Sequence, residues 1–109
     1  MDDVTRQKIE SLVNDNKVVL FMKGTKNFPQ CGFSGAVAQI LKNLDVGYKD
    51  VNVLADPAVR EGVKEYAQWP TIPQLYIDGK FIGGCDIVRE LHSRGELATM
   101  LRDAGAVAP

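Results

Sequence analysis

The stretch WPTIPQLYIDGKFIGG, residues 69–84, decides the fold of this chain. Its first part contains two prolines and is not helical, because proline lacks a backbone N–H and clashes with the preceding turn of a helix. Asp78-Gly79 then separates two apolar runs, and an Asp-Gly pair in that setting strongly indicates a β-hairpin. Gly83-Gly84 allows a sharp turn directly after it. The stretch thus predicts an antiparallel pair of strands.

Apolar patterns on both sides of the hairpin predict the remaining elements. The continuous apolar run at 18–22 is typical of a strand that is buried on both faces. Such a strand, a helix and a second strand form a right-handed parallel crossover, to which the hairpin adds its antiparallel pair. We therefore expect an α/β fold with a four-stranded mixed sheet flanked by helices on both faces. In chain order the predicted elements are a helix up to residues 14–16, strand 18–22, a helix from residue 31 or 32 to before 47, strand 48–53, a helix opened by Asp56-Pro57, strands 74–77 and 80–82, a helix with the apolar stripe Ile87, Val88 and Leu91, and a last helix with Leu97, Met100 and Leu101.

The composition is that of one ordinary globular domain, which we place at residues 1–109 with a flexible tail at 105–109. The formal net charge is −1, so no electrostatic pattern suggests a nucleic acid or an anionic membrane as partner. No apolar run is long enough to cross a bilayer. The acidic start, Met1-Asp2-Asp3, lacks the features of a signal or transit peptide. We therefore expect a cytoplasmic protein, although an organelle protein whose transit segment had been removed would begin in the same way.

Cys31 is the candidate reactive residue. It stands at the expected start of a helix, where unpaired N–H groups and the helix dipole favour a thiolate, and Lys23 before it adds a positive charge. The alternative is a structural cysteine in the core, for which Gly32 and Pro29 make an awkward setting. Ser34 stands where a dithiol motif has its second cysteine. The motif therefore permits a mixed disulfide or a metal–thiolate bond but not dithiol cycling.

Three motifs in register carry a family resemblance. CGFS at residues 31–34, with Lys-Gly-Thr at 23–25 before it, resembles the active loop of monothiol, CGFS-type glutaredoxins. WPTIPQLY at 69–76 and GGCD at 83–86 match the same family in order and spacing, so the resemblance covers residues 5–104 approximately. It implies a thioredoxin-like fold, which agrees with the order of elements predicted above.

The resemblance also implies a site for glutathione, a peptide with two carboxylates, one ammonium group and one thiol. Lys23 and Arg60 match the family's positions for the glycyl carboxylate. The backbone of Ile72 would pair with the cysteinyl part of the ligand. Cys85 and Asp86 would take the γ-glutamyl group, through backbone N–H groups at a helix start and a carboxylate that accepts from the ammonium.

These positions also have plainer interpretations from the residues alone. Residues 71–73 can be a rigid turn, although the family's matching proline, here Pro73, is cis and faces the reactive cysteine. The double glycine with Asp86 can be a turn and an N-cap. Arg60 can be an exposed helix residue, and we place Trp69 in the core.

The first hypothesis for function is an iron–sulfur carrier. A [2Fe–2S] cluster needs four ligands, and Cys31 with one glutathione thiol supplies two, so two protomers would share one cluster as a homodimer. Family members pass clusters to acceptor proteins and pair with BolA-like proteins. The second hypothesis is a glutathione-dependent thiol–disulfide oxidoreductase, in which Cys31 attacks a mixed disulfide and a second glutathione resolves it. CGFS-type members are generally poor at this, so we expect at most a weak enzyme.

A third hypothesis is a redox-sensing adaptor that uses both cysteines of the chain. Cys85 is either free or pairs with Cys31 on oxidation, and the sequence leaves both open. Two cysteines cannot complete a four-thiolate metal site within one chain, so a cluster would require ligands from outside it.

Overall fold

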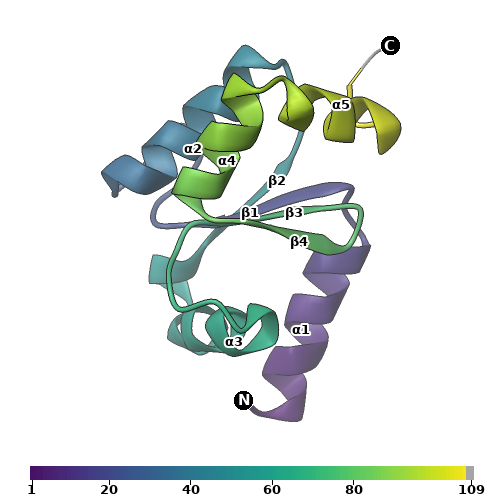
Figure 1. Ribbon diagram of the computed structural model, residues 1–109. Helices are drawn as coiled ribbons and strands as arrows, with labels where there is room; N and C mark the ends of the chain where they lie inside the picture. Colours follow the sequence, from purple (N-terminus) through teal and green to yellow (C-terminus); the bar gives the residue numbers. More distant parts are fainter. Residues whose placement is uncertain (108–109) are drawn as a thin grey trace.

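The computed structural model describes residues 1–107 and has the predicted order of helices and strands (Figure 1). The elements are α1 (Asp3–Asn14), β1 (Val18–Met22), α2 (Gly32–Asn43), β2 (Lys49–Asn52), the 3-10 helix η1 (Val53–Ala55), α3 (Pro57–Ala67), β3 (Gln74–Ile77), β4 (Lys80–Gly83), α4 (Cys85–Ser93) and α5 (Glu96–Asp103). No helix within residues 1–107 combines the length and the apolar character needed to cross a bilayer.

The sheet has the strand order β2-β1-β3-β4. Leu20 in β1 pairs with Asp50 of the parallel neighbour β2 and with Leu75 of the antiparallel neighbour β3. The two central strands are buried along their whole length, as predicted for the apolar run of β1. Asp78 and Gly79 form the β3–β4 turn with φ of 54° and 78°, the positive values that a two-residue type I′ turn requires. The predicted mixed sheet and hairpin are confirmed.

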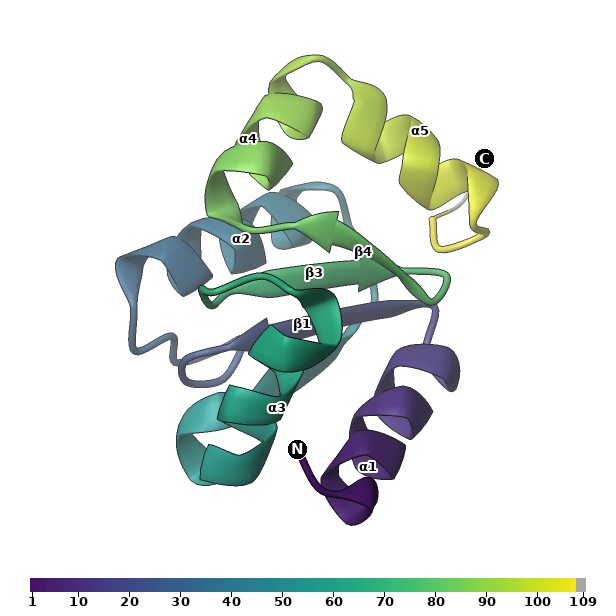
Figure 2. The ribbon, with the colours of Figure 1, turned by 60° about the horizontal axis from the view of Figure 1, so that its bottom comes forward.

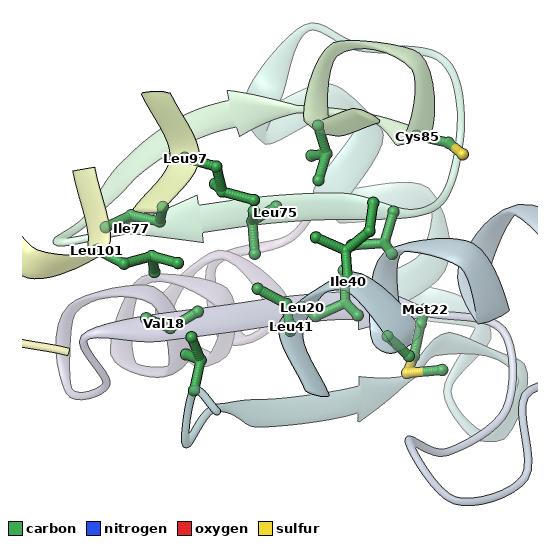
Figure 3. Packing of buried hydrophobic residues seen from close by; sticks show 14 residues of the cluster. Val18, Leu20, Met22, Ile40, Leu41, Leu75, Ile77, Cys85, Leu97 and Leu101 are labelled. Carbon is green, nitrogen blue, oxygen red and sulfur yellow. The ribbon is translucent and has the colours of Figure 1, made fainter. Parts of the chain in front are cut away.

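Helices cover both faces of the sheet, with α2 and α4 on one side and α1 and α3 on the other (Figures 1 and 2). Side chains of β1 serve both layers, because successive side chains of a strand point to opposite faces. Val18, Leu20 and Met22 pack in the core under α2, α4 and α5, and the two residues between them pack in the core under α1 and α3. Figure 3 shows the core under α2, α4 and α5. Cys85 lies at its margin, and its sulfur is directed away from the other labelled side chains.

The strand predicted at 48–53 is one residue shorter than expected at each end. Asn52 is its last residue, and its side chain accepts a hydrogen bond from the N–H of Leu54 at 3.0 Å. The same oxygen accepts from the N–H of Gly24 at 2.9 Å. Local bonding by the asparagine side chain thus turns the chain into η1 and ties it to the loop that follows β1.

Ile87, one of the three apolar residues that marked α4 in the sequence, lies on the exposed side of the helix. Its side chain is 38% exposed and lies over Gly83, where an added Cβ would come within 2.7 Å of it. Val88 takes the buried position instead, with no exposed surface. The missing side chain of Gly83 therefore gives Ile87 a place on the surface beside the start of α4.

A flexible tail was predicted at 105–109, and the structure describes residues 105–107 of this segment. Gly105, with φ of 74°, ends α5, and the next N–H, of Ala106, donates to the carbonyl of Leu101 at 2.9 Å. Ala106 and Val107 pack against the core under α2, α4 and α5. Residues 108 and 109 lie outside the described part of the chain.

Candidate functional site

Cys31 lies at the N-cap of α2 and is partly exposed. The backbone N–H of Ser34 is the main cause that holds the pKa of the Cys31 thiol below its usual value. The N–H of Phe33, the hydroxyl of Ser34 and the charge of Lys23 act in the same direction, and partial burial opposes them. The open end of a helix thus favours a thiolate here, as the sequence predicted.

Ser34 fixes this cysteine to the sheet. Its side chain has no exposed surface, and its Oγ accepts a hydrogen bond from the N–H of Lys23 at 3.0 Å. The carbonyl of Lys23 in turn accepts from the N–H of Gln30 at 2.9 Å. The serine of the CGFS motif therefore joins the end of β1 to the first turn of α2, and so sets the position of the thiol.

The loop between Lys23 and Cys31 depends on a glycine. Gly24 has φ of 90°, and a Cβ there would lie 2.5 Å from the carbonyl oxygen of Phe28 and 2.6 Å from the nitrogen of Gln30. Both contacts are with backbone atoms, which cannot swing aside as the end of a side chain does. The close turn that leads to the cysteine thus requires glycine at this position.

Helix α3 brings two cations to the site. Asp56 caps the helix by accepting from the N–H of Val59 at 3.2 Å, and Pro57 follows it at the first turn. Arg60 and Lys64 lie one turn apart on this helix and both line the same cleft. The Nε of Arg60 is buried and has no hydrogen-bond partner among the described residues. Lys64 was not among the predicted site residues, although its i+4 spacing from Arg60 was the available signal.

The loop at residues 69–73 forms one wall of the cleft. Its Ile72–Pro73 peptide bond is cis, as the resemblance implied. Trp69 was wrongly placed in the core: it is partly exposed, lines the cleft and packs against Phe81 at a ring-centroid distance of 5.6 Å. Its indole Nε1 is buried without a hydrogen-bond partner in the described chain. An aromatic residue before two prolines is equally compatible with a core or a cleft wall, so the sequence alone could not decide.

The start of α4 also lines the cleft, next to the 69–73 loop. Gly84 is the N-cap and makes no side-chain cap hydrogen bond, so Asp86 does not cap the helix as the plainer interpretation assumed. Asp86 is exposed in the first turn. Cys85 is 8% exposed, and burial raises the pKa of its thiol above the usual value. Gly84 leaves room for Trp69, whose Nε1 would be 3.2 Å from an added Cβ.

These walls enclose one cleft of about 510 Å³. All six residues singled out in the sequence lie on it, which places residues far apart in the chain around one space. Phe33, 58% exposed, and Ile87 extend the apolar part of its rim, and neither was predicted there. The six predicted residues are Lys23, Cys31, Arg60, Ile72, Cys85 and Asp86.

The charges and thiols of the cleft define the ligand that it can accept. Lys23, Arg60 and Lys64 contribute positive charge, and Asp86 contributes the negative charge among the lining residues. Within residues 1–107 no group of three or more histidine, cysteine or acidic side chains is placed to hold a metal ion. The cleft thus suits a small anionic ligand that also carries a cationic group, next to a reactive thiol.

Comparisons with known proteins agree with this geometry. Residues 18–82 match the glutaredoxin family. The chain is 53% identical over 103 residues to "Probable monothiol glutaredoxin 2" of Rickettsia typhi, covering 94% of this chain and 93% of that protein. It is 60% identical over 92 residues to "Monothiol glutaredoxin-S14, chloroplastic" of Arabidopsis thaliana, covering 84% of this chain but 53% of that protein. Since relatives include chloroplastic, mitochondrial and bacterial proteins, the cytoplasmic location stays a prediction.

Two solved structures have the same fold. The reduced apo form of poplar GrxS14 has 52% identity and a TM-score of 0.81, with 94% of each chain covered. A buckwheat glutaredoxin–glutathione complex has 32% identity and a TM-score of 0.86, with 96% of this chain and 94% of that chain covered. The expected thioredoxin-like fold is confirmed.

Proposed function

Since this chain belongs to the glutaredoxin family and is a monothiol member of it, we propose that it binds glutathione and carries a [2Fe–2S] cluster to acceptor proteins. The observation that carries the proposal is the cleft itself. It joins a partly exposed cysteine of lowered pKa to three cations and a helix start within one space. This chain spans about half the length of the plant relative.

Glutathione fits the cleft by charge at both ends. Lys23, Arg60 and Lys64 offer positive charge for the glycyl carboxylate, and the Nε of Arg60 offers a donor that has no partner within residues 1–107. At the other end, the N–H groups at the start of α4 suit the γ-glutamyl carboxylate, and Asp86 suits its ammonium group. Ile72 lines the same cleft, and its backbone would pair with the cysteinyl residue of glutathione. This arrangement would hold the glutathione sulfur near Cys31.

The cluster is cargo that this chain cannot hold alone. Such a cluster needs four ligands, usually thiolates, and each protomer offers Cys31 and one bound glutathione thiol. Two protomers with two glutathiones would therefore complete the ligand set in a homodimer. A BolA-like protein in place of the second protomer would be the alternative partner. The lowered pKa of Cys31, caused mainly by the N–H of Ser34, favours the deprotonated form that a metal ligand requires.

A thiol–disulfide oxidoreductase is the second candidate function. The same lowered pKa of Cys31 favours nucleophilic attack on a mixed disulfide with glutathione. A second glutathione would then resolve the product, because the fully buried Ser34 replaces a resolving cysteine. This route uses the same cleft and requires no dimer.

Anaerobic reconstitution with iron, sulfide and glutathione distinguishes the two functions. We expect a brown dimer with visible charge-transfer absorption from the native protein and a colourless product from Cys31→Ser. Cys85→Ser is the matched control and should keep the cluster, because Cys85 contributes through its backbone. Colourless native protein with rapid deglutathionylation would instead favour the oxidoreductase.

A further inference from the structure

We propose that Gln74 is a positioning residue that holds the glutathione-binding loop in shape from inside the protein. Gln74 opens β3 and has no exposed surface. Its side-chain Nε2 donates to the carbonyl of Trp69 at 3.1 Å and to the carbonyl of Thr71 at 3.3 Å. The inference rests on the proposed function, since it concerns the loop whose Ile72 backbone would meet glutathione.

The loop needs donors from outside itself. Pro70 and Pro73 have no N–H. The loop therefore has few backbone donors for the carbonyl groups of Trp69 and Thr71. A carbonyl without a donor in a buried place costs free energy, and the loop would then turn that group towards water. One side-chain amide with two N–H groups meets both needs at once.

The orientation of the Gln74 amide follows from its partners. Both carbonyls only accept hydrogen bonds, so the NH₂ group of Gln74 must face them. Its Oε1 on the other side accepts from the hydroxyl of Tyr76 at 3.2 Å. Tyr76 is 2% exposed, and burial raises the pKa of its hydroxyl, which keeps the proton on the donor. The hydrogen bonds therefore run in one direction, from the Tyr76 hydroxyl to Gln74 and from Gln74 to the loop carbonyls.

The sheet holds both residues of this hydrogen-bond network, Gln74 and Tyr76, in place. Gln74 pairs with Phe21 in β1, and Tyr76 packs against the Phe21 ring at a centroid distance of 5.6 Å. The loop above carries Trp69 and Ile72, which both line the cleft. Gln74 thus ties the wall of the cleft to the central strands, although it does not itself line the cleft.

The experiment titrates S-methylglutathione, which has no free thiol, into the ¹⁵N-labelled protein and follows the spectrum by NMR. Gln74→Met is the test variant: it keeps an unbranched side chain of similar size and removes both donors. Tyr76→Phe is the matched control, because it breaks the same network but leaves both bonds to the loop. Trp69 is the only tryptophan of the chain, so its indole resonance reports on the loop without any ligand.

We expect Gln74→Met to weaken binding about tenfold and to shift the Trp69 indole resonance, on the scale of one or two lost buried hydrogen bonds. Tyr76→Phe should change the affinity less than about threefold, even if it lowers the unfolding midpoint as much as Gln74→Met does. In the native protein the side-chain NH₂ of Gln74 should exchange with water far more slowly than that of the exposed Gln7. This last measurement needs no variant to fold.

Two results would overturn the inference. One is native-like affinity and an unchanged indole resonance in Gln74→Met; the other is a Gln74 NH₂ that exchanges as fast as that of Gln7. If the native protein failed to bind S-methylglutathione at all, the proposed function would fail, and the indole and exchange measurements would still judge the hold of Gln74 on the loop.

Discussion

Replacing Ser34 by alanine tests whether the serine of the CGFS motif has the structural role described above. The substitution removes the Oγ that accepts from the N–H of Lys23 at 3.0 Å, in a place with no exposed surface. A buried donor left without its acceptor costs about 1–3 kcal/mol, and this donor is only partly buried, so we expect about 1–2 kcal/mol. At about 4–8 °C per kcal/mol for a domain of this size, the melting temperature should fall by roughly 5–15 °C.

The same substitution should raise the pKa of Cys31 without restoring its usual value. The Ser34 hydroxyl is one cause of the lowered pKa, but the largest cause, the backbone N–H at position 34, remains in the alanine variant. The rate of alkylation by iodoacetamide should therefore rise at a higher pH than in the native protein. It should still rise at a lower pH than for a thiol with the usual pKa.

Urea unfolding followed by tryptophan fluorescence measures the stability of this variant, and the pH dependence of alkylation measures the thiol pKa. Ser93→Ala is the matched control, because Ser93 is exposed and its hydroxyl donates a hydrogen bond to the carbonyl of Glu90 within its own helix. It should stay within about 0.5 kcal/mol of the native protein. If Ser34→Ala were as stable as Ser93→Ala and alkylated like the native protein, the account of the motif would be refuted.

Three further predictions concern other parts of the chain. Alkylation of Cys31 should reach its maximum rate at a lower pH than that of Cys85, because the N–H of Ser34 lowers the first pKa and burial raises the second; equal pH profiles in a peptide-mapped time course would contradict this. Gly24→Ala should lose about 1–3 kcal/mol of stability in urea unfolding, since φ is 90° and backbone atoms block the added Cβ. Gly47→Ala should lose nothing, because, apart from its neighbours in sequence, nothing in the described chain lies within 4 Å of the added Cβ. Similar losses in the two variants would disprove the steric argument. Asp56→Ala should lose about 1 kcal/mol through the missing cap of α3 and Asp56→Asn much less, and equal losses by thermal unfolding would count against a capping role.

The fold could be predicted from the sequence because each element carries a local signal. The apolar run of β1, the Asp78-Gly79 turn and the Asp56-Pro57 cap each act over a few residues, so neighbouring letters suffice to recognise them. The strand ends came within one residue for the same reason. The apolar pattern did not show which of the apolar residues of α4 is exposed, because the position of Ile87 over Gly83 is a contact between two elements.

The site could be predicted only where a motif marks it. Cys31 and the residues of the resemblance lie on one cleft. Lys64 could have been added from its i+4 spacing to Arg60, whereas the place of Trp69 on the cleft depends on how the 69–73 loop packs. The bonds from Gln74 to that loop were also invisible in the sequence, since a glutamine in a strand has no local pattern that shows it to be buried. Such contacts depend on tertiary packing, for which sequence spacing is no guide.

A count of glutathione in the reconstituted holo protein tests the central proposal most directly. The protein is loaded anaerobically, freed from excess glutathione by rapid desalting and denatured in acid, and iron, sulfide and released glutathione are quantified. If Cys31 and the glutathione thiol are the ligands, the count should be about two glutathiones per cluster in a dimer, because the four ligands come in equal numbers from both sources. Full cluster occupancy with no released glutathione would contradict the proposal and indicate ligands from the protein alone.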